Sequence, residues 1–196
     1  MADLPETELD LLSAAREGSQ EAGRRLMAAH GPSMVRTARN VLGRYGGNEA
    51  DDVVQEAFIA ALTTAALPTG DQGAWLRAIT VRKALDSIRL ARRRGEQPLP
   101  ESDGAVAELE RQGSASLPLD VLAVREGLRL LSPKDRAVLT LVDLEGRSMA
   151  ETAAALGITN VAVRLRAVRA RRKLAGVLRR RLPQDAAALD ARGGTP

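Results

Sequence analysis

The chain has 196 residues, 44% of them hydrophobic and three aromatic, which suits one ordinary domain or two small ones with an aliphatic core. It carries a formal net charge of +4, no cysteine and one histidine, so disulfides, thiolate zinc sites and histidine metal clusters are excluded. The acidic start MADLPETELD lacks the order of a signal peptide, and the longest uncharged run, 57–70, is too short to span a bilayer. We predict a cytoplasmic, all-α protein with no metal, no cofactor and no membrane insertion.

Helical periodicity dominates the first half of the chain. It predicts one helix that ends near Gly18, a second from Ser19 to about Gly46, a third across 51–62, and a fourth that begins near Trp75. The fourth helix is strongly basic, because residues 75–95 hold seven basic side chains and one acidic side chain. Trp75 stands where loop becomes helix, and we read it first as an anchor in the core.

The third helix carries a bare acidic face in a basic chain. Its apolar residues from Val53 to Leu62 form a wide arc that we expect to be buried. Glu49, Asp52 and Glu56 lie beside this arc, with Asp51 and Gln55 on its other flank. A DNA-facing surface would not carry these carboxylates, so they indicate a basic protein partner.

The character of the sequence changes after the fourth helix. Glycine, proline and small polar residues interrupt 95–118, and residues 96–126 hold seven acidic and two basic side chains. We predict a flexible acidic linker between two small helical domains. The predicted boundaries are 1–93 for the first domain, 94–120 for the linker, 121–182 for the second domain and 183–196 for a tail.

The second domain has the pattern of a helix-turn-helix. One helix begins at Ser132 and is expected to stop at Gly146, and the next begins with the capping-box pair Ser148 and Glu151 and ends at Gly157. A long helix then follows with one narrow apolar stripe. Residues 158–182 contain nine basic and no acidic side chains, a repulsive arrangement that indicates a polyanionic partner such as nucleic acid.

Three segments together resemble a known family. They are EADDVVQEAF (49–58), WLRAITVRKALDSIR (75–89) and the stretch from LSPKDRAVLT to VRARRKL (131–174). In this order they are similar to the extracytoplasmic-function sigma factors, the small two-domain branch of the sigma-70 family. The resemblance covers about residues 8–92 and 121–178. It implies an alternative sigma factor that binds core RNA polymerase and promoter DNA, opens the DNA, and performs no enzymatic reaction.

The resemblance also implies roles for individual residues. The acidic surface would consist of Asp51, Asp52, Gln55 and Glu56 and would bind the clamp helices of the polymerase. The loop 68–73 would capture a flipped-out base, and the acidic linker would thread toward the polymerase cleft. The implied −10 element contacts are Trp75, Arg77, Arg82, Lys83, Asp86, Arg89 and Arg93. The implied −35 element contacts are Asn160, Val161, Arg164, Leu165, Arg166, Arg169, Arg171 and Arg172. An anti-sigma factor would be a further partner.

Some positions depart from the family pattern. Arg82 stands where the family often has Asn, and Val161-Ala162 replaces a small residue followed by Thr. The base-capture loop also lacks the aromatic residue often found just before the Trp. We therefore expect a promoter preference of its own and weak unaided melting.

Two other functions stay open at this point. The first is a helix-turn-helix repressor or activator that acts without polymerase, which explains both basic helices but not the acidic surface. The second is an adaptor whose basic helices bind an acidic protein, and its affinity for DNA would lack a steep salt dependence.

Overall fold

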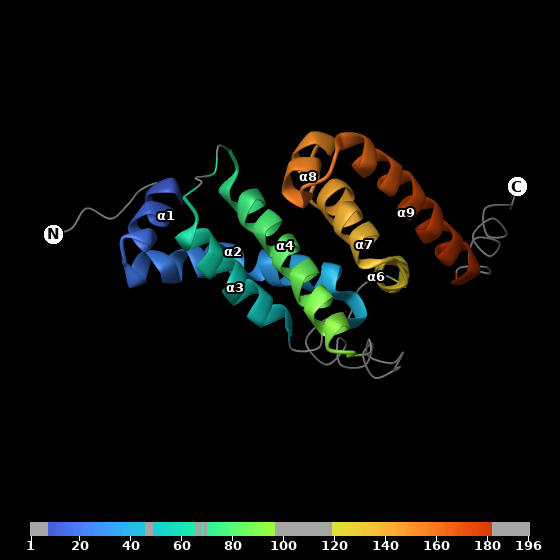
Figure 1. Ribbon diagram of the computed structural model, residues 1–196, viewed down its shortest axis with the longest axis horizontal. Coiled ribbons are helices and arrows are strands. Elements are labelled where there is room, and N and C mark those ends of the chain that lie inside the picture. The colour runs from blue at the N-terminus through green and yellow to red at the C-terminus, as the bar shows by residue number, and fades with distance from the viewer. Residues whose placement is uncertain (1–7, 46–48, 66–67, 69, 97–118, 182–196) are drawn as a thin grey trace, which may run out of the picture.

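The computed structural model describes residues 8–45, 49–65, 68, 70–96 and 119–181, and every regular element within them is helical. The first group of helices is α1 (Glu8–Arg16), α2 (Gln20–Leu42), the 3-10 turn η1 (Gly43–Tyr45), α3 (Glu49–Thr63) and α4 (Gln72–Arg93). The second group is α6 (Leu119–Arg129), α7 (Pro133–Leu139), the π-helical turn η2 (Thr140–Leu144), α8 (Met149–Leu156) and α9 (Asn160–Arg181). Figure 1 shows α4 lying between the rest of the first group and helices α7 and α8. The all-α, two-domain prediction is confirmed.

The first four predicted helices are present, with small differences at their ends. Helix α4 begins at Gln72, three residues before the predicted start, because the Asp71 side chain accepts a hydrogen bond from the backbone N–H of Ala74. Ser19 caps α2 in the same way. Helix α2 ends at Leu42, since Gly43 has a φ of +58° that favours glycine.

In the second domain the predicted caps are confirmed and one helix was missed. Ser132 caps α7, the Ser148–Glu151 capping box opens α8, and Gly157 closes α8 in the left-handed conformation. Helix α6 was not predicted: it begins at Leu119, inside the segment read as linker. The remaining linker residues 97–118 and the tail 182–196 lie outside the described residues.

The two domains are packed against each other through a continuous core. Fully buried residues of the first domain, such as Met34 and Leu76, belong to the same apolar cluster as Ala137, Leu141 and Ala155 of the second domain. A second, smaller cluster joins α7 and α8 to α9. The described chain is therefore a closed body, in which the position of α7 on α2 and α4 fixes the position of α9.

Arg136 of α7 is the polar centre of this domain contact. Its side chain is 2% exposed, and its guanidinium donates to the carbonyl oxygens of Val41 and Leu42, each at 2.9 Å, at the C-terminus of α2. It also donates to the carbonyl oxygens of Arg129, the last residue of α6, and of Leu131 just beyond it, at 3.1 and 2.9 Å. One cation thus satisfies the orphan carbonyls of two helix ends and opposes the negative end of the α2 dipole.

The fit around Arg136 is tight. Burial lowers its pKa to about 10, with the nearby Tyr45 acting in the opposite direction, so the guanidinium stays protonated at neutral pH. A Cβ placed on Gly43 would lie 2.5 Å from the Arg136 Cζ atom. Glycine is therefore required at position 43 both by its backbone conformation and by the approach of this arginine.

We expect Arg136→Ala to lower the free energy of unfolding by more than about 3 kcal/mol, because each buried carbonyl that loses its donor costs about 1–3 kcal/mol. Arg136→Lys should recover only part of the loss, since an ammonium cannot replace the planar fork of donors. Urea unfolding followed by circular dichroism measures both. The exposed Arg89→Ala serves as control, and a loss for Arg136→Ala no larger than for this control would contradict the assigned role.

Candidate protein and nucleic-acid interfaces

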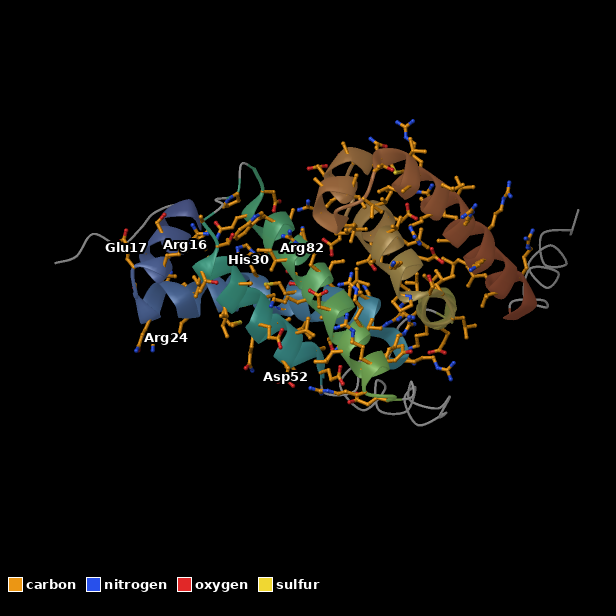
Figure 2. All side chains as sticks on the ribbon, viewed as in Figure 1. Arg16, Glu17, Arg24, His30, Asp52 and Arg82 are labelled. Carbon is orange, nitrogen blue, oxygen red and sulfur yellow. The ribbon has the colours of Figure 1, made fainter. Side chains whose placement is uncertain are left out.

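Helix α3 presents the predicted acidic surface to solvent. Val53, Val54, Ala57, Phe58 and Ala61 are buried, as the helical pattern predicted. The four surface residues Asp51, Asp52, Gln55 and Glu56 are all exposed, and Figure 2 shows Asp52 at the outer edge of α3.

Within the described part of the chain, Asp51 and Asp52 have no ion pair. Glu56 lies 3.6 Å from the Lys83 ammonium of α4, and Glu49 accepts a hydrogen bond from Ser87 at 3.0 Å. Ile59, 62% exposed, lies one turn further along the same face and was not singled out from the sequence. The acidic surface is thus an open face that combines carboxylates with one apolar side chain.

The structure divides the seven candidate residues of α4 among four environments. Arg82, Asp86, Arg89 and Arg93 are exposed, and Asp86 accepts a hydrogen bond from Arg89. Figure 2 shows Arg82 on this helix. Trp75 is half-buried and packs against the core, as its first interpretation held. Lys83 instead faces α3, where its ammonium lies near Glu56.

Arg77 faces the second domain, where Glu145 holds it. The Arg77 Nε donates to one carboxylate oxygen of Glu145, and the hydroxyl of the buried Thr37 donates to the other at 2.7 Å. Both ionic side chains are largely covered, with 19% of Arg77 and 14% of Glu145 exposed. Neither Glu145 nor Thr37 was predicted to matter, because they lie 68 and 108 positions from their partners along the chain.

The helix-turn-helix is built as its sequence indicated. Ala153 and Val163, both buried, bring α8 and α9 together across the turn at Gly157. The Ser148 side chain and backbone both donate to Glu151, which lowers the pKa of this carboxyl. Val163, Ala167 and Ala170 form the fully buried stripe of α9. The remaining surface of α9 is consequently fixed in orientation.

The basic side chains from Arg164 to Lys173 of α9 fall into two sets. Three turn back toward acidic residues of the same domain: Arg166 and Lys173 lie 3.6 and 3.8 Å from Asp135, and Arg171 donates to Asp143. The hydrogen bond to Asp143 raises the pKa of Arg171. Arg164, Arg169 and Arg172 are exposed and have no ion pair among the residues that the structure describes. This second set is free to meet an external anion.

Asn160, the first residue of α9, is half-buried, and its side-chain oxygen is buried without a hydrogen-bond partner.

Among the described residues, no group of acidic and histidine side chains could hold a metal ion. No helix of the described part is long and apolar enough to cross a membrane.

Two families match the chain in the order of its two domains. Sigma-70 region 2 matches residues 26–94, and Sigma-70 region 4 matches residues 122–174. The chain is 32% identical over 174 residues to the ECF RNA polymerase sigma factor SigM of Mycobacterium tuberculosis, covering 88% of this chain and 85% of SigM. It is 34% identical over 182 residues to the RNA polymerase sigma factor CnrH of Cupriavidus metallidurans, covering 86% and 92% of the two chains.

Solved structures of similar fold are also known. CnrH in complex with the cytosolic domain of CnrY matches with a TM-score of 0.59 and 31% identity, covering 87% of this chain and 96% of CnrH. The sigma factor RpoE in complex with the anti-sigma factor NepR from Bartonella quintana matches with a TM-score of 0.57 and 19% identity, covering 80% and 96%. The second likeness concerns the fold alone.

The pairing of Arg77 with Glu145 leads to a prediction about the domain contact. Glu145→Gln should lower the free energy of unfolding by about 2 kcal/mol, because hydrogen bonds to a covered charged group are worth about 1.5–3 kcal/mol. The matched control is Glu21→Gln, which removes an exposed ion pair with Arg24 worth less than about 1 kcal/mol. Urea denaturation compares them, and equal losses for the two variants would contradict a stabilising role for Glu145.

Proposed function

The chain belongs to the extracytoplasmic-function RNA polymerase sigma factors of the sigma-70 family, and from this premise we propose that it binds core RNA polymerase, directs it to a two-part promoter and helps to open the DNA. The observation that carries the proposal is the coexistence of an open acidic surface on α3 with arginine-rich, solvent-facing surfaces on α4 and α9. A protein that bound only DNA would have no use for the acidic surface, whose carboxylates would repel phosphates.

Each surface has a proposed partner. The acidic surface binds basic helices of the polymerase, and the exposed face of α4 with Arg82, Arg89 and Arg93 contacts the −10 element. The start of α9, with Arg164 and neighbouring side chains, contacts the −35 element in the major groove. These roles place polymerase binding and −10 recognition in 1–93 and −35 recognition in 121–182, with 94–120 as linker and 183–196 as tail.

The closed body cannot contact both elements at once. Helix α4 contacts α8, and α8 contacts α9, so α4 and α9 are one helix apart, or about 20 Å at ordinary packing distances. The −10 and −35 elements are about 25 base pairs apart by their names, which is about 85 Å at about 3.4 Å per base pair. We infer that the domains separate on the promoter, and that the contacts of Arg136 and Glu145 are then broken.

A regulatory partner is the other part of the proposal. Two of the solved sigma factors of similar fold were determined as complexes, CnrH with the cytosolic domain of CnrY and RpoE with the anti-sigma factor NepR. We propose that an anti-sigma factor binds and restrains this chain. The chain itself acts in the cytoplasm as a DNA-recognition regulator without enzymatic activity.

Charge reversal on the acidic surface tests polymerase binding. Asp52→Lys with Glu56→Lys places like charges against a basic partner, so affinity for core polymerase should fall at least tenfold, or about 1.4 kcal/mol. Nonspecific DNA affinity should hold or rise, because the net charge of the chain rises by four units. Glu17→Lys with Glu21→Lys makes the same change of charge on another exposed segment and is the matched control.

Size-exclusion binding to core polymerase and DNA titration give both affinities on folded protein. If the protein were a repressor that acts without polymerase, neither double variant would change its association with polymerase. Equal polymerase affinities for the α3 variant and its control would therefore end the assignment of this surface.

The reading role of α9 gives a separate prediction. Arg164→Ala should reduce transcription from a promoter whose −35 element is essential, because a lost base or phosphate contact costs about 1–3 kcal/mol. Binding to core polymerase should stay unchanged. Arg171→Ala, whose side chain is paired with Asp143, should have a smaller effect. Normal transcription by the Arg164 variant would show that this helix is wrongly placed.

A further inference from the structure

Helix α9 has a second apolar stripe that faces solvent. Val161, Leu165 and Val168 are 73%, 48% and 47% exposed, at steps of four and three residues that place them on one side of the helix. The opposite side, centred on the fully buried Ala167, packs against the rest of the domain. Helix α9 is thus apolar on two opposite sides, and nothing in the described part of the chain covers the exposed one.

The surroundings of this stripe limit what could cover it. Arg164 and Arg169 flank it, Arg172 follows one turn after Val168, and all three arginines are exposed without an ion pair among the described residues. The paired arginines are instead held by Asp135 and Asp143 of the same domain. An occupant of the stripe must therefore offer apolar groups within a strongly negative surface.

The major groove of DNA has this combination. Among the base edges that face the groove, the C5 methyl of thymine is the apolar group, and it lies between two rows of phosphates. A stripe from residue 161 to residue 168 rises about 10 Å at about 1.5 Å per residue. That length matches about three base pairs at about 3.4 Å each.

We propose that Val161, Leu165 and Val168 contact thymine methyl groups, so that the upstream promoter element is recognised through one to three neighbouring thymines. The inference rests on the proposed function of α9 as the reader of that element, and adds the base chemistry that it recognises. Arg164, Arg169 and Arg172 would hold phosphates on either side of the stripe and position it, without reading sequence themselves.

Replacing thymine by deoxyuridine removes the methyl group and leaves the base pairing unchanged, so it tests this contact alone. Full-length protein with core polymerase first selects promoter duplexes from a random library. Each thymine of the upstream element, on both strands, is then replaced by deoxyuridine one at a time. We expect about fourfold weaker binding for each contacted methyl, the value of one buried methyl-sized group.

Two variants assign the contact to residues. Val161→Ala should lose the sensitivity to deoxyuridine at one position and keep it at the others, and circular dichroism should report an unchanged fold because Val161 is exposed. Arg164→Ala should weaken binding to thymine and deoxyuridine duplexes by the same factor.

The outcomes separate this inference from the proposed function. If no deoxyuridine weakens binding while Arg164→Ala still does, the thymine inference is wrong and α9 remains the reader. If neither change has an effect, α9 does not read DNA, and both the thymine inference and the proposed role of α9 at the −35 element are wrong. The thymine inference would also be wrong if alanine variants of the stripe kept full promoter affinity but no longer bound a protein partner.

Discussion

The bonds from the Arg136 guanidinium to the last carbonyls of α2 are the interaction on which the described arrangement depends. They are made by a buried cation that joins helix ends from both domains. The cation lies so close to Gly43 that a larger residue would not fit at that position. Because α7 carries α9 on its other side, this joint sets where α9 lies relative to α4. Glu145 extends the joint by holding Thr37 and Arg77 of the first domain.

This joint is a polar one, which has consequences for function. Buried charges that lose their partners are costly unless water replaces them. In the domain separation that we propose, water would solvate Arg136, Arg77 and Glu145, so the closed form could open without leaving these charges unpaired in a core. The apolar core that Ala137, Leu141 and Ala155 share with the first domain adds to the stability of the closed form.

Local pattern was sufficient for most of the helices and caps. The arc of α3, the capping box at Ser148 and the turn at Gly157 depend on residues within a few positions of one another. The sequence does not reveal helix α6, because its acidic residues continue the charge of the linker, although its Leu128 is buried against α7 and α9. The charge of α9 was evident from sequence, but the division into paired and unpaired arginines was not, since Asp135 and Asp143 lie on other elements.

The domain contact could not be predicted in this way. Arg136 pairs with carbonyls 94 and 95 positions away, and backbone carbonyls leave no mark in the sequence. Arg136 follows Lys134 and Asp135 in the sequence, so nothing local distinguishes this buried arginine from an exposed charge of the first turn of α7. The resemblance of the three segments gave the family and the order of the domains, but not their packing.

The measurement that tests the account most directly is run-off transcription with purified core polymerase on templates from the host genome, beginning with the region upstream of the gene for this protein. The account predicts transcripts from a discrete start site that require both the protein and core polymerase. They should disappear when either the −10 or the −35 element is replaced. If core polymerase initiates equally with and without the protein on every template that the protein binds, the protein does not act as a sigma factor. Its basic helices would then serve another purpose.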